Sequence, residues 1–368
     1  MNSTLDGLRV ALAFDWLTTS GGGEQVLLAA HHLFPTAPIY TSLYAPHNVP
    51  QFSGATVNTS YLQLLPYAHK RHQLLIPLMP AAFESFNFKE FDAVISIGNG
   101  FSKGIITVPG QFHLSYCQTP PRYLWNLGND SRNRGRLDSP LRAIAEHQLR
   151  IWDVVSAARP DRILANSQTV ADRIAKIYRR QADVLYPPVD TDLFLPTEQP
   201  TNDYFLSVGR LVGYKRIDIL ISACLKSGQL LKIVGEGPER NELEKQAQGS
   251  SLIQFLGRQP IERLQELYAN AKAFLFAGEE DFGIVPVEAM SAGRPVLAYN
   301  KGGLTESVLD GVTGMLYPMQ SSESLVAAIS IFDPNRYDSK TIRQHAKKFS
   351  TSVFIDGLRQ AVIEGVCQ

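Results

Sequence analysis

The chain has 368 residues, and its 35 Lys and Arg balance 35 Asp and Glu, so the formal net charge is zero. This length suffices for two domains, and the balanced charge excludes the strongly basic composition typical of nucleic-acid-binding proteins. The three cysteines, Cys117, Cys224 and Cys367, are widely spaced. They argue against a disulfide framework or a cysteine zinc site and fit a reducing cytosol. Neither a secretory leader nor an apolar run of about 18 to 20 residues is visible, so we expect a cytoplasmic protein.

The first half of the chain alternates apolar strands with helices. The pattern predicts a strand over 8–14, a loop over 15–23 and a helix over 24–33. Further predicted strands cover 39–42, 93–97, 113–117, 162–165 and 183–185, and further helices cover 141–158 and 167–178. Alternation of this kind is typical of a parallel sheet covered by helices on both faces.

Residues 61–80 are rich in leucine and contain the basic run His-Lys-Arg-His at 69–72. A basic amphipathic helix can lie on a membrane surface, which would make the protein peripheral on the inner face of the plasma membrane. The alternative is a helix that packs on its own domain and leaves a basic turn in solvent.

The alternation breaks over 186–200, where four prolines indicate a linker. A second series then begins. Predicted strands cover 204–208, 231–234, 253–256, 274–277 and 295–299, and predicted helices start at 217, 239 and 261. A last apolar-periodic helix covers 350–366. We therefore predict two α/β domains, with ligands beyond the carboxyl ends of the strands.

Glu280 and Glu288 stand eight residues apart, on either side of a glycine and a proline. The strand before them and a short helix ending at Gly293 place Glu280 in a strand-to-helix loop and Glu288 inside the helix. The helix N-terminus attracts anions, and carboxylates accept hydrogen bonds from hydroxyls. This combination suits a ligand with phosphate in the middle and sugars at both ends.

Other strand ends of the second domain carry residues suited to the same ligand. Arg210 and Lys215 follow the strand that ends at Val208 and can hold a diphosphate. Gly235 and Gly237 let backbone approach a flat ligand closely. The turn at 255–258 can read a nucleobase with its backbone groups, and Lys-Gly-Gly at 301–303 forms another strand-to-helix turn.

In the first domain, the glycines at 21–23 follow the first strand and open a helix, which predicts a second phosphate-facing turn. They form neither a dinucleotide fingerprint, because Val26 stands where a small residue is needed, nor a P-loop, because no Gly-Lys-Ser/Thr follows. Asp190 and Asp192 have the spacing of a metal–nucleotide motif of another transferase fold, but they follow two prolines, and we interpret them as a capped turn.

Taken in order, these motifs resemble glycosyltransferase family 4. The resemblance covers almost the whole chain and is carried by Glu-x7-Glu at 280–288, Gly-Arg-Leu-x-x-Tyr-Lys-Arg, Gly-Glu-Gly-Pro and Ala-Asn-Ser. It implies the GT-B fold, two Rossmann-like domains facing a central cleft. It also implies a retaining, metal-independent transfer of a sugar from a nucleotide donor to a hydroxyl, with no resident cofactor.

By this resemblance Arg210, Lys215 and Glu280 are the catalytic residues. The two cations hold the diphosphate, Glu288 accepts from the ribose, and Glu280 contacts the hexose. The donor-binding set it implies is Gly22, Gly23, Gln118, Gly209, Arg210, Lys215, Gly235, Gly237, Arg258, Glu280, Phe282, Gly283, Ile284, Val285 and Glu288. The expected domains are 1–188 on the acceptor side, a linker over 189–202 and a nucleotide-sugar domain over 203–349. A helix over 350–368 returns to the first domain.

The segments at 116–125 and 184–194 look most like bacterial mannosyltransferases of surface polysaccharide synthesis, which implies GDP-mannose as the donor and a glycan or polyprenyl-linked acceptor. One departure is Gln118, which stands where many members carry a histidine that contacts the hexose. The alternatives are a UDP-hexose donor, a UDP-sugar epimerase and a nucleotide-sugar-binding protein without activity. An epimerase should add acid/base carboxylates, which we do not identify, and the intact cations and glutamates count against an inactive protein.

Overall fold

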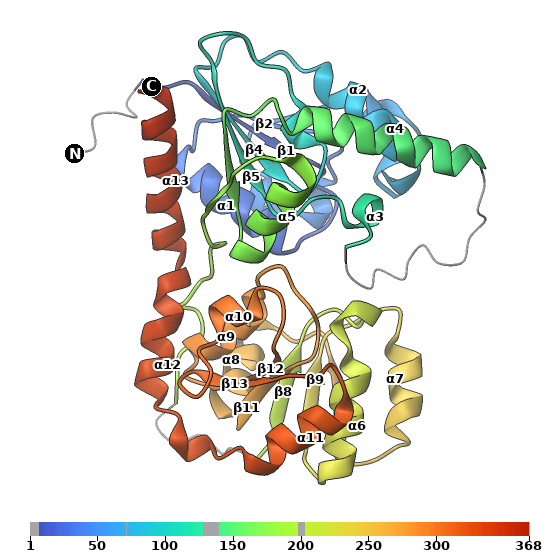
Figure 1. Cartoon of the computed structure of the whole chain (residues 1–368), viewed down its shortest axis with the longest axis vertical. Helices are drawn as coiled ribbons and strands as arrows, with labels where there is room; N and C mark the ends of the chain where they lie inside the picture. Colours follow the sequence, from blue (N-terminus) through green and yellow to red (C-terminus); the bar gives the residue numbers. More distant parts are fainter. Residues whose placement is uncertain (1–6, 71, 128–139, 198–202, 368) are drawn as a thin grey trace. The chain divides into compact units, whose positions relative to one another are not determined.

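The computed structural model describes residues 7–70, 72–127, 140–197 and 203–367. These residues form two compact units, each built around its own parallel sheet (Figure 1). The first unit contains the chain up to Pro188 and again from Ser352, and the second contains Val189–Thr351. The predicted α/β class with two parallel sheets is confirmed.

The first unit contains a seven-stranded sheet in the order β3-β2-β1-β4-β5-β6-β7. Its strands are β1 Val10–Phe14, β2 Ile39–Thr41, β3 Val57–Thr59, β4 Ala93–Gly98, β5 Phe112–Cys117, β6 Arg162–Ala165 and β7 Asp183–Val184. Its α-helices are α1 Gly22–Leu33, α2 Met79–Glu84, α3 Arg122–Trp125, α4 Pro140–Ser156, α5 Gln168–Tyr178 and α13 Thr351–Val366. Short 3-10 turns are η1 Pro46–Asn48, η2 Pro50–Phe52, η3 Tyr61–Leu64, η4 Ala68–Lys70, η5 His72–Leu78 and η6 Ser102–Gly104.

Alternate residues of the central strands point into two separate cores, as the two-residue period of a strand requires. On one face Leu12 and Ile95 pack with α1 and with Phe354 of α13. On the other face Ala13 and Val94 pack with the region around α2 and α4. Strands buried on both faces have to be apolar throughout, which explains the continuous apolar runs in the sequence.

Helix α13 completes the first core although it lies at the far end of the chain. Phe354 packs edge-on against Tyr116 of β5 at 5.5 Å between ring centroids, and Glu364 pairs with Arg162 of β6 at 2.7 Å. The predicted last helix is therefore present, and it contributes its apolar face to the unit that contains the chain's beginning.

A buried ion pair fixes the turn that follows β4. The Nζ atom of Lys103 lies 2.5 Å from a carboxylate oxygen of Asp153 on α4, and both side chains are at least nine-tenths buried. The other oxygen of Asp153 accepts hydrogen bonds from Trp125 Nε1 at 2.7 Å and Tyr178 Oη at 2.9 Å. A charge pair without access to water is stable only when its remaining hydrogen-bonding capacity is filled in this way. The pair joins α3, α4 and α5 to the carboxyl edge of the sheet.

The second unit contains a six-stranded parallel sheet in the order β10-β9-β8-β11-β12-β13. Its strands are β8 Phe205–Val208, β9 Leu231–Val234, β10 Ile253–Gly257, β11 Ala273–Phe276, β12 Val296–Tyr299 and β13 Gly314–Tyr317. Its α-helices are α6 Ile217–Ser227, α7 Arg240–Ala247, α8 Ile261–Asn270, α9 Ile284–Ser291, α10 Leu304–Ser307, α11 Ser322–Ile331 and α12 Ser339–Ala346, and its 3-10 turns include η8 Gly213–Lys215.

The predicted helix over 61–80 is wrong. In place of one helix the structure has the turns η3, η4 and η5, followed by the start of α2. Pro66 and Pro77 explain the difference, because proline removes a backbone donor and clashes with the preceding turn of a helix. Leu65, just before the first proline, is extended, as expected for a residue that precedes proline. Strands β3 and β13 were not predicted.

Candidate functional site

The central strands of the second sheet provide a natural ligand position. From β8 the chain moves outward to β9 and β10, and it then returns to β11 on the other side of β8. The loops after β8 and β11 therefore lead away in opposite directions, and ligands bind at such switch points in open α/β sheets. Lys215 follows β8 and Glu280 follows β11, so the fold brings the two predicted residues to one place.

Lys215 and Glu280 form an ion pair, with Nζ 2.6 Å from Oε1. Their side chains are only 13% and 20% exposed, so water screens the pair less than it would at a free surface. The ammonium group also lies 5.1 Å from the ring centre of Phe276, the last residue of β11. Packing against this ring and the carboxylate fixes the Lys215 charge at the switch point.

Glu288 lies on α9 and is the second carboxylate near this lysine. Burial raises its pKa to about 7, while a hydrogen bond from Tyr268 and the charge of Lys215 oppose the rise. The Tyr268 hydroxyl donates to Oε2 of Glu288 at 2.9 Å. Tyr268 belongs to α8 and was not predicted, because no local pattern marks a tyrosine whose partner lies twenty residues away.

Helix α9 begins beside these carboxylates. Gly283 is its N-cap with φ +91°, and Ile284 and Val285 are the first two helical residues. Their N–H groups have no partner inside the helix and point out of its N-terminal end, which attracts anions. Phe282 is buried and packs on Phe349 at 5.2 Å, so it anchors the turn. The predicted site residues from 280 to 288 are thus contiguous in space.

The turn at 301–303 supports the Glu280 loop from behind. Gly303 N donates to Glu280 O at 2.9 Å, and Lys301 pairs with Glu279 at 3.2 Å. The first contact uses the backbone carbonyl of Glu280 and the second uses the side chain of Glu279. Neither involves the Glu280 carboxylate, which pairs with Lys215.

Gly235 and Gly237 have a structural task. A Cβ at Gly235, where φ is +131°, would overlap the carbonyl oxygen of Gly209, and one at Gly237 would overlap that of Leu211. The loops after β8 and β9 thus pack backbone to backbone. Close packing of the backbone is therefore sufficient reason for glycine at both positions. Direct contact of these glycines with a ligand remains a prediction.

Replacing Gly235 with alanine should destabilise the second unit by roughly 3 kcal/mol, because both backbone strain and overlap with Gly209 are imposed. Gly228→Ala is the matched control: Gly228 also has positive φ, +65°, but no atom lies within 4 Å of its Cβ position. Urea unfolding of both variants measures the difference. Equal losses of stability would show that the Gly209 contact contributes nothing.

Arg210 and Arg258 are both exposed at the carboxyl edge of the second sheet. Arg210 directly follows Gly209 after β8, and Arg258 follows β10, the outermost strand on that side. Arg210 therefore follows the same strand end as Lys215, whereas Arg258 lies two strands farther out.

The first unit contains the remaining predicted residues. Gly22 and Gly23 form the first turn of α1, and Gln118 directly follows β5. A Cβ at Gly23 would lie 2.8 Å from Nε2 of Gln118, so the amide packs against this helix turn. Nε2 is buried and has no hydrogen-bond partner among the described residues. Gly22, Gly23 and Gln118 therefore meet within their own unit.

Asp15 occupies the switch point of the first sheet and was not predicted. Its carboxylate accepts hydrogen bonds from the backbone N–H groups of residues 99–102, at 2.8, 3.0, 2.9 and 2.7 Å. Glu24, in the first turn of α1, was also missed. It is 8% exposed, and burial raises its pKa to about 7 while the backbone N–H groups of Gly21 and Glu24 limit the rise.

Asp190 and Asp192 behave as interpreted from the sequence. The Asp190 carboxylate accepts from the backbone N–H of Asp192 at 3.2 Å and of Leu193 at 3.1 Å. Asp192 pairs with Arg343 at 3.3 Å. Within the described ranges no group of three or more His, Cys, Asp or Glu side chains could hold a metal ion.

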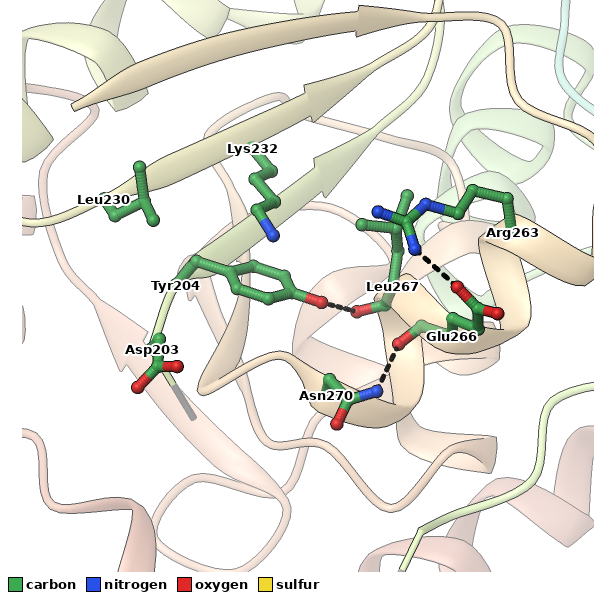
Figure 2. A pocket seen from close by; sticks show the side chains of 8 residues that line it. All are labelled: Asp203, Tyr204, Leu230, Lys232, Arg263, Glu266, Leu267 and Asn270. Atoms are coloured by element: carbon green, nitrogen blue, oxygen red, sulfur yellow. Dashed lines mark hydrogen bonds and ion pairs between the residues drawn. The ribbon is translucent and has the colours of Figure 1, made fainter. Parts of the chain in front are cut away.

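A hollow of about 380 Å³ lies at the opposite, amino-terminal edge of the second sheet (Figure 2). Three of its charged side chains have contacts within the protein: Arg263 pairs with Glu266 at 2.5 Å, and the Lys232 ammonium lies 3.6 Å from the ring centre of Tyr204. The hollow is lined by Asp203, Tyr204, Leu230, Lys232, Arg263, Glu266, Leu267 and Asn270. It includes none of the predicted site residues.

A family model of glycosyl transferases matches most of the second unit. The family profile described as "Glycosyl transferases group 1" matches residues 191–349. A D-inositol 3-phosphate glycosyltransferase of Mycolicibacterium smegmatis is 30% identical over 250 residues, which is 60% of this chain and 55% of the relative. An uncharacterised glycosyltransferase of Methanocaldococcus jannaschii is 28% identical over 193 residues, 52% of this chain and 54% of the relative. The chain thus spans little more than half of these relatives.

Solved structures match nearly the whole chain. HepE of Anabaena, in complex with UDP and glucose, has a TM-score of 0.71 at 18% identity and covers 96% of this chain and 99% of its own. A sucrose-phosphate synthase of Thermosynechococcus elongatus has a TM-score of 0.75 at 17% identity, with 97% and 98% covered. At such identities the likeness shows the fold, and the predicted GT-B class is confirmed.

Proposed function

We propose that the chain transfers a hexose from a nucleoside-diphosphate sugar to a hydroxyl group of an acceptor. The observation that carries this proposal is the ion pair of Lys215 with Glu280 at the switch point of the second sheet, where the lysine charge also acts on Glu288. A cation that acts on two carboxylates, beside a helix N-terminus, suits a diphosphate with a sugar at either end. The match of residues 191–349 to group 1 glycosyl transferases supports the same reaction class.

Each residue has a proposed task in holding the donor. An ammonium group has three N–H donors, so Lys215 can bind Glu280 and a phosphate oxygen together. Arg210, in the same loop after β8, adds a second cation, and the N–H groups that open α9 add neutral donors. Glu288 accepts from the ribose hydroxyls and Glu280 from the hexose. The charge that develops on the leaving diphosphate is thereby stabilised without a protein nucleophile.

The proposal includes retention of configuration and independence from metal ions. Both follow from the family resemblance, and the cationic side chains supply the charge that a metal would otherwise provide. Transfer by the purified protein in EDTA should equal transfer in Mg²⁺ within about twofold, and an activity that vanishes in EDTA would refute this part.

The donor base and the sugar are proposed from two different observations. The resemblance of 116–125 and 184–194 to mannosyltransferases favours GDP-mannose with a glycan or polyprenyl-linked acceptor. UDP-hexose is the second candidate, favoured by the solved HepE structures with UDP and with UDP-glucose. In either case Gln118, packed on α1 of the first unit, is proposed to contact the hexose where other proteins use a histidine.

A thermal-shift screen of the whole chain against GDP, UDP, ADP and their sugars tests the proposal. A ligand that binds the native state at 100 times its Kd stabilises it by about 2.7 kcal/mol, enough to move the melting point. We expect one nucleotide series to raise Tm, with Lys215→Ala abolishing the shift and the surface variant Lys226→Ala keeping it. A chain that responds to none of the three series would contradict the proposal.

The raised pKa of Glu288 predicts that donor binding strengthens as pH rises from 6 to 8. With a pKa of about 7, the ionised fraction of Glu288 grows about tenfold over this range, and the ionised form is the one that accepts hydrogen bonds from the ribose hydroxyls. The Kd of the donor should therefore fall by about the same factor. The measurement is calorimetric titration with an intact nucleotide sugar, whose diphosphate does not titrate here. Because Glu24 also has a pKa of about 7, Glu288→Gln is the decisive control, and its Kd should be flat.

A further inference from the structure

The carboxylate of Glu288 has a partner to which the proposed function gives no task, the hydroxyl of Tyr268. Oη of Tyr268 donates to Oε2 of Glu288 at 2.9 Å and joins helix α8 to helix α9. Burial and the neighbouring Glu288 charge raise the pKa of Tyr268 well above its usual value. The hydroxyl therefore keeps its proton and acts as a donor over the whole neutral pH range.

The ring of Tyr268 is held in one orientation by other rings. Tyr268 is 1% exposed. Its ring centre lies 4.7 Å from that of Phe194 and 6.0 Å from that of Phe274 on β11. A side chain packed in this way inside a protein stays in a single rotamer. Tyr268 thus presents its hydroxyl to Glu288 from a fixed position.

Phe194, the nearer of these two rings, is anchored through the backbone of its segment. The carbonyl of Leu193 accepts a hydrogen bond from Gln265 of α8 at 2.7 Å, and the carbonyl of Phe194 accepts one from Arg343 of α12 at 3.4 Å. Arg343 also donates to the carbonyl of Ser291, the last residue of α9, at 3.1 Å. The segment before Leu195 is therefore tied to both helices that carry the tyrosine and the carboxylate.

Three groups from three different elements act on the charge of Glu288. The hydrogen bond from Tyr268 and the positive charge of Lys215 lower the pKa of Glu288, and the negative charge of Asp190 raises it, as burial does. Tyr268 therefore stabilises the ionised carboxylate, which is the form that accepts hydrogen bonds from hydroxyl groups.

We propose that Tyr268 is a positioning residue of the donor site: its hydroxyl fixes Oε2 of Glu288 and leaves Oε1 to accept from the ribose hydroxyls. An ionised carboxylate has about four acceptor positions, so one bond from Tyr268 does not exhaust them. A carboxylate that is already held in place loses less freedom when it binds the ribose, which strengthens binding. The ribose part of this inference rests on the proposed function, whereas the hold of Tyr268 on Glu288 can be tested without a ligand.

Tyr268→Phe removes only the hydroxyl and keeps the ring that packs on Phe194. Its binding is measured by calorimetric titration with GDP-mannose and, in parallel, with UDP-glucose. Losing a hydrogen bond to the ionised form should move the pKa of Glu288 up by roughly one unit. The Kd of the variant should therefore exceed the wild-type Kd by about tenfold at pH 6 but only about twofold at pH 8. A purely structural tyrosine would give a ratio that does not change with pH.

Tyr204→Phe is the matched control. Tyr204 is also buried, and its hydroxyl donates at the same 2.9 Å, but to the backbone carbonyl of Leu267 (Figure 2). This variant should keep the wild-type Kd at every pH. In a Glu288→Gln background, Tyr268→Phe should add less than about twofold to Kd, because the tyrosine acts through the carboxylate.

The melting point as a function of pH tests the contact without a ligand. Glu288 has a pKa of about 7 in the folded protein, above its ordinary value, so its ionisation lowers stability as pH rises towards 7. Without the hydroxyl this loss should continue to about pH 8. The melting point of Tyr268→Phe should therefore fall further below that of the wild type by about 3 to 5 °C between pH 6 and pH 9, while the deficit of Tyr204→Phe stays constant.

The possible failures are distinguishable. A wild-type chain that binds neither nucleotide sugar would overturn the proposed function, and the ribose contact of Glu288 with it. A wild-type chain that binds one of them, with a Tyr268→Phe variant whose Kd ratio and melting-point deficit do not change with pH, would overturn the positioning role of Tyr268 alone.

Discussion

Replacing Lys215 with alanine is expected to lower kcat/KM for sugar transfer by a factor of about 10² to 10³. Removing one fixed donor to a developing negative charge costs roughly 2.7 to 4 kcal/mol of transition-state stabilisation. Lys215 is such a donor, held 2.6 Å from Glu280 with little exposure to water. Its loss also leaves Glu280 and Glu288 without their cation, so the site would repel a diphosphate and KM should rise as well.

Lys226→Ala is the control for this experiment. Lys226 belongs to the same unit and also pairs with a glutamate, Glu323 at 2.5 Å, but its side chain is 52% exposed. It should lose no activity, because exposed ion pairs contribute little. Lys215→Arg should recover part of the activity, since the charge returns with a different shape. Turnover of Lys215→Ala within threefold of wild type, with an unchanged melting point, would remove Lys215 from the diphosphate site.

Asp153→Ala is expected to produce the largest loss of stability, about 3 to 5 kcal/mol. The change leaves the buried Lys103 ammonium without its counter-charge, which is more costly than removing both partners. Trp125 and Tyr178 lose their acceptor at the same time. For a unit of this size the melting point should fall by roughly 6 to 20 °C, measured by calorimetry.

Two comparisons isolate the buried charge. Lys103→Met with Asp153→Leu replaces the pair with apolar groups and should be more stable than Asp153→Ala alone, because no unpaired charge remains. Glu323→Ala breaks an exposed ion pair and should shift the melting point by less than about 3 °C. Equal losses for Asp153→Ala and Glu323→Ala would mean that burial of the Lys103 pair adds nothing.

The sequence predicted those parts of the site that depend on local order. Glu280, Glu288 and the helix between them follow from a strand, a glycine, a proline and an eight-residue spacing, and Lys215 follows from its place after a strand. Parallel strands carry such loops to one edge, so the contact between Lys215 and Glu280 could be anticipated from topology alone. The structure adds that Lys215 pairs with Glu280 and that its charge also lowers the pKa of Glu288.

What could not be predicted depends on partners far apart in the chain. Tyr268 reaches Glu288 from another helix, and Asp15 meets a turn more than eighty residues later. No pattern in the sequence next to Tyr268 or Asp15 indicates which residue it contacts. The segment after Tyr61 misled for a different reason: its leucines have helical spacing, but Pro66 and Pro77 prevent the helix. Short strands such as β3 leave too little periodicity to detect.

Asp15 affects which of the two sheets can bind an anion at its switch point. Backbone N–H groups gathered at a switch point form a cradle for phosphate in many nucleotide-binding folds. In the first unit that cradle already contains an anion of the protein's own, since the Asp15 carboxylate takes the N–H groups of four successive residues. A second negative charge would be repelled there. The corresponding place in the second unit presents Lys215 instead. Under the proposed function, Asp15 would therefore direct the nucleotide to the second sheet and leave the first for a neutral, hydroxyl-bearing molecule.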